Sequence, residues 1–121
     1  MKKLYRDGKI SVWYSTKKGF CVFSSVSLKI GEHITTCAIS PIGFKDVREN
    51  SKFNDYPMYW TKKEDCVAFG VINLLNHSDR SNICLKRDYK RKLINAYAIE
   101  NISPNVELTI NYDCNLWFKY V

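Results

Sequence analysis

Three short segments, far apart in the chain, carry the residue types on which a chemical function would depend. They are Lys18-Gly19-Phe20-Cys21-Val22-Phe23, then Leu75-Asn76-His77-Ser78 with Asn82, then Glu107-Leu108-Thr109-Ile110-Asn111-Tyr112. Each alone has an ordinary explanation, since a Gly before an apolar strand usually makes a turn and Asn-His-Ser usually caps or turns the chain. A Tyr that ends a strand is usually packed. The functional argument therefore depends on the order and setting of the three segments.

Several common chemistries lack their motifs here. There is no Gly-x-Gly-x-x-Gly and no phosphate loop. No Cys-x-x-Cys pair occurs, so no metal site is predicted. His33 has no partner motif and is expected on the surface of a strand. The scattered cysteines are expected to pack as small apolar residues in a reducing, intracellular compartment; they are Cys21, Cys37, Cys66, Cys84 and Cys114.

Together the three segments resemble the SET domain of protein lysine methyltransferases. Gly19 to Phe23, followed by Gly31-Glu32, is similar to the opening glycine strand and Gly-Glu turn of that family. Asn76-His77-Ser78 resembles its central signature, and residues 106–112 resemble its closing one. The resemblance runs from about residue 9 to Trp117 and indicates the minimal viral or bacterial type, which lacks zinc-binding flanking segments.

One further element and three departures belong to the same comparison. Residues 55–60, Asp-Tyr-Pro-Met-Tyr-Trp, look like an Asp-Tyr-x-aromatic element of small SET proteins. Cys21 stands at the second motif glycine, where a Cβ would crowd the cofactor if the backbone required close approach or positive φ. Ser81 replaces a proline, and Asn105 replaces the glycine of the last turn.

The resemblance implies an S-adenosylmethionine-dependent protein lysine N-methyltransferase whose expected substrate is a histone tail. It implies that Tyr112 is catalytic and orients the amine beside the transferring methyl group. Tyr56 and Tyr59 would line a channel for the substrate lysine, with simple packing as the alternative. The residues implied for cofactor binding are Lys18, Gly19, Phe20, Cys21, Asn76, His77 and Trp117.

That reaction suits the residues present. An attacking lysine must lose its proton, and its ordinary pKa is about 10.4, so burial and nearby positive charge would help. The displacement at the methyl carbon is in line, so catalysis is mostly orientation and electrostatic placement. No nucleophilic Ser or Cys is needed.

The elements that must position these segments are mostly short strands. The sequence predicts strands at 10–15, 20–23 and 34–39, the last ended by Pro41 and Gly43, with turns at 17–19 and 28–32. It predicts an irregular insert at about 45–65, a short helix or buried strand at 66–75, and a hairpin of 83–85 with 93–99 around a charged tip at 86–92. A turn at 102–105, a final strand at 108–112 and an aromatic tail at 114–121 complete the chain.

Residues 28–34 and 102–108 share a faint repeat. Gly31 and Asn105 occupy equivalent positions, and both residue types tolerate positive φ. The same tight turn is therefore expected to lead into a strand twice.

The predicted fold is mainly β with little helix, one domain over residues 1–121. Many short strands without β-α-β alternation disfavour a doubly wound nucleotide-binding fold. The resemblance implies the SET-domain (β-clip) fold, with small curved sheets and a C-terminal pseudoknot. That topology would bring Asn76-His77 beside Tyr112.

Charge and length suggest partners. The chain has 19 Lys and Arg against 12 Asp and Glu, a net charge of +7, which favours an acidic partner such as nucleosomal DNA or serves solubility alone. No apolar run approaches the roughly 20 residues of a membrane span, and no signal peptide is expected. A histone substrate implies the nucleus or chromatin, and uncovered apolar edges make a homodimer plausible.

Two other functions compete with the enzyme. One is a catalytically inactive SET-like module that binds protein or nucleic acid, which Cys21 and the missing zinc segments favour. The other is a basic RNA-binding β-barrel with exposed aromatic residues, which leaves the coincidence of three motifs unexplained.

Overall fold

The computed structural model describes residues 1–43 and 58–111, and most regular elements in these ranges are β-strands. The N-terminal strands are β1 (Lys2–Arg6), β2 (Ile10–Ser15), β3 (Gly19–Ser24) and β4 (His33–Gly43). From residue 58 onward come β5 (Met58–Tyr59), β6 (Glu64–Phe69), the 3-10 helix η3 (Val71–Leu74) and β7 (Asn76–His77). The remaining strands are β8 (Ile83–Asp88), β9 (Leu93–Ala98) and β10 (Thr109–Ile110).

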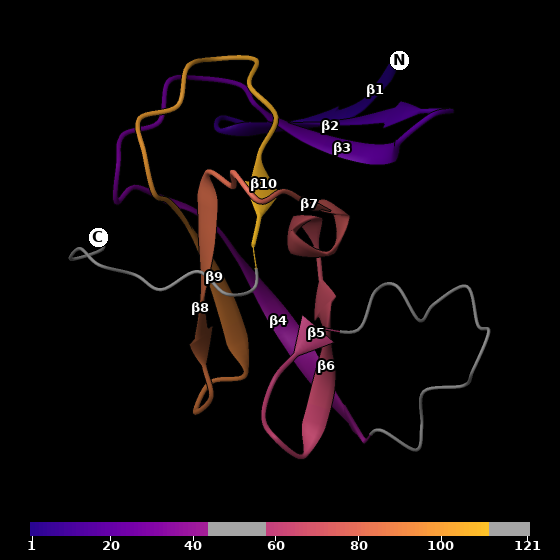
Figure 1. Ribbon diagram of the computed structural model, residues 1–121, viewed down its shortest axis with the longest axis vertical. Helices are drawn as coiled ribbons and strands as arrows, with labels where there is room; N and C mark the ends of the chain where they lie inside the picture. The colour runs from indigo at the N-terminus through magenta and orange to yellow at the C-terminus, as the bar shows by residue number, and fades with distance from the viewer. Residues whose placement is uncertain (44–57, 112–121) are drawn as a thin grey trace.

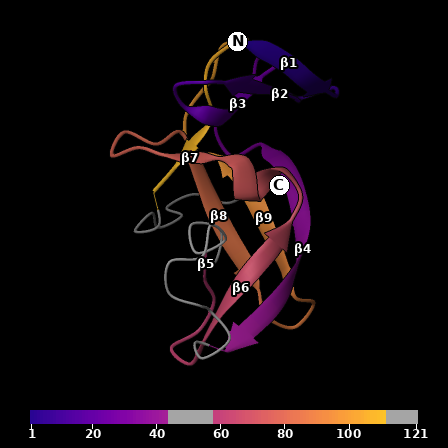
Figure 2. The same ribbon diagram turned by 90° about the vertical axis from the view of Figure 1, so that its right-hand side faces the viewer.

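Across this part of the chain the strands form two sheets. The antiparallel sheet β1-β2-β3 lies at one end of the molecule, and the larger sheet has the order β5-β6-β4-β9-β8-β10-β7 (Figures 1 and 2). The prediction of a mainly β fold with little helix is confirmed.

A common core joins the two sheets. Val22 of β3, Ile72 of η3, Ile94 of β9 and Ile110 of β10 belong to one buried cluster, and each is at most 2% exposed. Burying a side chain of this size contributes about 1.5–3 kcal/mol. The short strand β10 is therefore anchored by its apolar side chain as well as by its backbone pairing.

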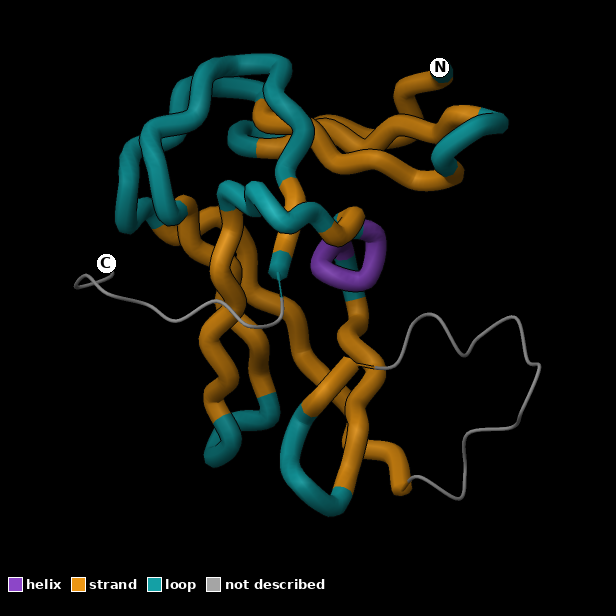
Figure 3. Tube along the Cα trace, in the orientation of Figure 1, coloured by secondary structure: helices purple, strands orange, loops and turns teal. Residues whose placement is uncertain are grey.

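The repeated turn is confirmed. Gly31 has φ 83° and Asn105 has φ 64°, so both adopt the left-handed conformation that their residue types tolerate. The two loops also run side by side (Figure 3), because Leu28 and Ile102 exchange backbone hydrogen bonds of 2.8 Å in both directions. This pairing joins the segment that follows β3 to the segment that precedes β10.

The predicted end of the strand at 34–39, which corresponds to β4, was wrong. β4 continues through Pro41 to Gly43, because its pairing with β9 stops at Ala38 and only β6 accompanies the rest. A proline is tolerated where one side of a strand has no partner.

Other elements also differ from the predictions. β1 was not predicted, and the final strand, expected at 108–112, is regular only at Thr109–Ile110 among the described residues. Residues 58–59 and 64–65, expected in the irregular insert, are paired strands, while residues 44–57 lie outside the described residues. The stretch 66–75 contains both alternatives in succession, the end of β6 and then η3. The predicted hairpin is confirmed, but β8 extends to Asp88, so its exposed tip is only residues 89–92.

The end of the described chain is threaded between two strands. β10 pairs in parallel with β7 on one side and with β8 on the other. The connection 78–82, which joins β7 to β8, must therefore pass across β10. This is the arrangement that the implied pseudoknot requires.

Candidate active site

The pairing of β7 with β10 creates the site. Asn76 is opposite Thr109 and His77 is opposite Ile110, and the Ser78 N–H donates to the Ile110 carbonyl at 3.0 Å. The sequence required the chain at His77 to lie against the final strand, and this is confirmed for the described residues.

Asn82 holds the threaded segment in register. Asn82 is only 6% exposed. Its Nδ2 donates to the Glu107 carbonyl at 2.8 Å, and its Oδ1 accepts from the Thr109 N–H at 2.9 Å. A two-residue strand offers few ladder hydrogen bonds of its own. The Asn82 amide supplies two more, on either side of Leu108.

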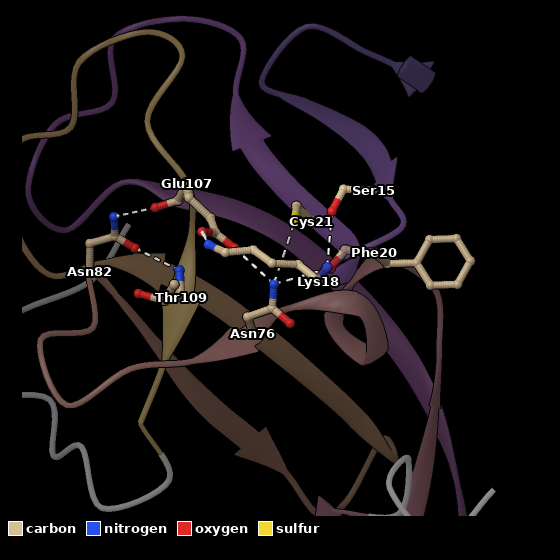
Figure 4. A network of polar contacts seen from close by, with 8 residues as sticks. All are labelled: Ser15, Lys18, Phe20, Cys21, Asn76, Asn82, Glu107 and Thr109. Carbon is tan, nitrogen blue, oxygen red and sulfur yellow. Dashed lines mark hydrogen bonds and ion pairs between the residues drawn. The ribbon is translucent and has the colours of Figure 1, made fainter. Parts of the chain in front are cut away.

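A polar network joins the first, second and third motifs (Figure 4). Asn76 Nδ2 donates to the Phe20 carbonyl at 3.0 Å and to Glu107 Oε2 at 2.8 Å, and lies 3.6 Å from Cys21 Sγ. The other carboxylate oxygen of Glu107 accepts from Lys18 Nζ at 3.1 Å. Residues 31 and 89 positions away in the sequence, Asn76 and Lys18, therefore meet at the Glu107 carboxylate.

The network sets the charge states around it. The hydrogen bond to Glu107, together with its negative charge, raises the pKa of Lys18, so this ammonium stays charged at neutral pH. Burial raises the pKa of the Cys21 thiol, and the Glu107 charge adds to the effect. Cys21 is consequently a neutral thiol and not a reactive thiolate.

A cavity of about 400 Å³ opens beside this network. Every residue that lines it comes from one of the three motifs: Lys18, Asn76, His77, Ser78, Glu107 and Thr109. The lining residues carry an ammonium, a carboxylate, an amide, an imidazole and two hydroxyl groups. Such a lining suits a polar ligand that carries both signs of charge.

The other residues that were predicted from the first motif to bind the cofactor do not line this cavity. Gly19 has φ 74°, which ends the turn and starts β3. Phe20 directs its ring to Tyr14 of β2, 5.4 Å between centroids, and contributes its carbonyl to Asn76. Cys21 lies within β3 opposite Trp13, without positive φ, so a side chain is compatible with the local backbone.

The aromatic residues assigned to substrate and catalysis are only partly described. Tyr59 lies on β5, 51% exposed, with the Arg87 guanidinium 5.5 Å from its ring, and it is not part of the cavity lining. Tyr56, Tyr112 and Trp117 lie outside the described residues.

Sequence reasoning missed the roles of Glu107 and Asn82, although both lie in quoted motifs. It also assigned only the backbone around Lys18, whereas the Lys18 side chain forms an ion pair with Glu107, another residue that lines the cavity. A charged residue between Val106 and the buried Leu108, just before an apolar strand, was the available signal for Glu107.

The described residues contain no group of three or more His, Cys, Asp or Glu side chains suited to a metal ion. Cys21, Cys37 and Cys66 are free thiols, and these three and Cys84 are all buried, as expected. No helix in residues 1–43 or 58–111 is long and apolar enough to cross a membrane.

Comparison with known proteins identifies the class. The family model of the SET domain matches residues 19–113, so this chain belongs to the SET domain family.

Individual relatives agree with that membership. The H3 lysine-37 specific histone-lysine N-methyltransferase of Schizosaccharomyces pombe is 32% identical over 66 residues, which are 54% of this chain and 45% of that protein. The chain thus spans less than half the length of this relative. The crystal structure of a Plasmodium falciparum protein, assigned provisionally as a histone methyltransferase, is 27% identical with a TM-score of 0.71 and covers 93% of this chain and 100% of that one. KRYPTONITE in complex with mCHG DNA and SAH is 25% identical with a TM-score of 0.68, covering 93% of this chain and 25% of that one.

Proposed function

We propose that this chain is an S-adenosylmethionine-dependent protein lysine N-methyltransferase that acts on histone tails. The observation that carries the proposal is the cavity beside β7 and β10, whose lining comes entirely from the three motif segments. Two relatives support it, since one is a histone-lysine N-methyltransferase and another was crystallised with SAH, the product of this cofactor.

The cavity fits the amino-acid end of the cofactor. Asn76 Oδ1 accepts no hydrogen bond from the described residues, and the Lys18 ammonium lies on the same cavity. An unpaired acceptor and a cation match the ammonium and carboxylate of an α-amino acid. When bound, S-adenosylmethionine supplies the methyl group on a sulfonium. Gly19, Phe20 and Cys21 would contact its methionine part through their backbone, the His77 main chain would read the adenine edge, and Trp117 would cover it.

The chain's own residues would orient the incoming lysine. Tyr112 follows Ile110 by two residues, and Ile110 is the register partner of His77. Two residues of chain reach at most about 7 Å, which supports Tyr112 as the catalytic residue beside the cavity. Its hydroxyl would accept a hydrogen bond from the amine and aim the nitrogen lone pair in line with the methyl carbon. Tyr56 and Tyr59 would hold the alkyl stem of the lysine.

Methyl transfer tests these roles. The chain is incubated with histones and tritiated S-adenosylmethionine, and the product is located by mass spectrometry. Tyr112→Phe should reduce kcat by about a hundredfold or more, the scale of a lost group that orients and polarises the reacting atoms. Tyr5→Phe, on exposed β1, is the matched control and should keep full activity. Equal activity of the Tyr112→Phe variant and the wild type would remove Tyr112 from catalysis.

The exposed tip of the β8-β9 hairpin is proposed to contact nucleosomal DNA. Lys90, Arg91 and Lys92 are exposed there, and Arg91 lies 4.0 Å from Asp88. Replacing Lys90 and Lys92 together by Ala should lower the slope of log K against log salt by about 2, because each phosphate contact contributes about 0.9. An unchanged slope would exclude this contact. The proposal places the protein in the nucleus, as a chromatin regulator.

A homodimer is proposed because β1 is an exposed edge with apolar side chains. Leu4 and Tyr5 of β1 and Tyr14 of β2 are each more than 40% exposed. Light scattering that gives a monomer at all concentrations would reject it.

The second candidate function is a SET-like binding module without catalysis. The observation in its favour is Cys21, whose side chain occupies the motif's second glycine position and lies against Asn76. Calorimetry with S-adenosylmethionine separates the two functions. Saturable binding supports the enzyme, whereas no heat and no thermal shift would support the module.

A further inference from the structure

Asn76 uses its whole donor capacity inside the protein. A side-chain amide has two N–H groups, and the Nδ2 atom of Asn76 faces two strong acceptors, the Phe20 carbonyl at 3.0 Å and Glu107 Oε2 at 2.8 Å. Both N–H groups are therefore assigned. The amide has only its oxygen to offer to a ligand.

The orientation of this amide is forced by chemistry. Rotating it by 180° would bring Oδ1 against a carbonyl oxygen and a carboxylate oxygen, which repel it. The Phe20 carbonyl is a neutral backbone acceptor, so it favours this orientation of the Asn76 amide only modestly. The negative charge of Glu107 makes the stronger, charge-assisted hydrogen bond.

Glu107 is itself fixed from three directions. Its side chain is 20% exposed, Oε1 accepts from Lys18 Nζ, and Oε2 accepts from Asn76. Its carbonyl accepts from the buried Asn82 amide. A carboxylate held in this way has little freedom to turn away from Asn76.

We propose that Glu107 is a positioning residue for cofactor recognition: it holds the Asn76 amide nitrogen inside the protein, which leaves only the amide oxygen for a ligand in the cavity, so that Asn76 selects a ligand bearing an ammonium group. Glu107 acts here through Asn76. The inference rests on the proposed function, because the ammonium in question belongs to the amino-acid end of S-adenosylmethionine and its product. It adds a specificity-determining residue to that site.

The test compares two ligands and four proteins. Calorimetry measures S-adenosylhomocysteine and its analogue that lacks the α-amino group, against wild type, Glu107→Gln, Asn76→Ala and the double variant. The ratio of the two dissociation constants reports how strongly the ammonium is recognised. Glu32→Gln is the matched control, since Glu32 is 28% exposed and also pairs with a lysine, Lys9 at 3.2 Å, but does not line the cavity.

Wild type and Glu32→Gln should prefer the ligand with the amino group by roughly tenfold or more, the scale of a hydrogen bond to a charged group. Glu107→Gln should lose a measurable part of that preference, because its side-chain amide can turn either an oxygen or an N–H group toward Asn76. In the Asn76→Ala background the same substitution should change nothing further, because its effect passes through Asn76. Additive losses would mean that Glu107 contacts the ligand directly and would overturn the positioning role.

The failures of the two proposals are distinguishable. A wild type that binds neither ligand contradicts the proposed function. A wild type that binds and discriminates, with Glu107→Gln equal to Glu32→Gln, contradicts only the inference about Glu107. If Glu107→Gln does not fold, NMR of the wild type decides: the two hydrogen bonds from Nδ2 must protect the side-chain amide protons of Asn76 from solvent exchange, and unprotected protons overturn the proposal.

Discussion

Replacing Asn82 by Ala should loosen the threaded strand more than the removal of an exposed side-chain amide would. The substitution removes the hydrogen bonds at 2.8 Å to the Glu107 carbonyl and at 2.9 Å from the Thr109 N–H. Each bond contributes about 1 kcal/mol net, and two backbone groups lose their partner in a region where Asn82 is only 6% exposed. We expect the free energy of unfolding to fall by about 2–4 kcal/mol, equivalent to about 8–15 °C in Tm for a chain of this size.

Urea denaturation measures the loss, and amide hydrogen exchange localises it to Thr109 and Ile110. Asn101→Ala is the control, because Asn101 is exposed and its side chain accepts a single bond, from the Ile30 N–H at 2.9 Å. That variant should lose less than about 1 kcal/mol. If the two variants are equally stable, the Asn82 amide does not hold the threaded strand and the reasoning fails.

Asn82→Asp adds a pH signature to the same experiment. A carboxylate keeps the bond from Thr109 but turns an acceptor toward the Glu107 carbonyl, so its pKa in the folded state should rise above the ordinary value of about 3.9. A raised pKa means that folding favours the protonated form. The variant should therefore approach wild-type stability below about pH 4 and fall behind as the pH rises through the folded pKa. A pH-independent deficit would contradict this.

Three further substitutions test the turns and the ion pair. Asn105→Ala should cost about 1 kcal/mol in urea denaturation because Asn105 has φ 64°, while Asn105→Gly should cost little. Gly70→Ala should lower the free energy of unfolding by about 2 kcal/mol or more, because Gly70 has φ 133° and the new Cβ would lie 2.8 Å from Cys37 Sγ. In a Cys37→Ala background the Tm should recover in part. An equal loss of Tm in both backgrounds would exclude the clash. Glu32→Gln should destabilise the fold at neutral pH but not in acid. The hydrogen bond from the Lys29 N–H and, to a smaller degree, the Lys9 ammonium lower the pKa of Glu32 from 4.5. The stabilisation by the Glu32 carboxylate is therefore present above that value and is lost as the pH falls through the lowered pKa. A urea midpoint difference that persists unchanged in acid would contradict this.

Local chemistry made some of these features readable from sequence. Gly31 and Asn105 belong to the few residue types that tolerate positive φ, so the repeated turn was predictable without knowing the fold. The alternation of Ile10 and Val12 predicted β2, although the pattern fails at exposed Tyr14. The family resemblance supplied the pairing of the chain at His77 with the final strand, which no local pattern contains.

Other features depend on which segments meet. β4 passes through Pro41 because β9 stops pairing at Ala38, and the two-residue β5 exists only through its pairing with β6. A two-residue strand is too short to show a periodicity, and a proline in the sequence normally indicates the end of a strand. Glu107 is the clearest case, since its role arises from Lys18 and Asn76, which threading brings to it from distant parts of the chain.

Glu107 also couples ligand recognition to the stability of β10, the strand threaded between β7 and β8. The Glu107 side chain orients Asn76 at the cavity, while its carbonyl is held by Asn82 at the base of β10. A ligand that engages Asn76 should therefore tighten β10, even though the strand itself is only two residues long. At a concentration of 100 times Kd, S-adenosylhomocysteine should stabilise the fold by about 2.7 kcal/mol. On binding, the amide of Thr109 should gain more protection from hydrogen exchange than the amides of β1, which belongs to the other sheet. An equal gain at both places would mean that binding stabilises the whole molecule without acting through Glu107.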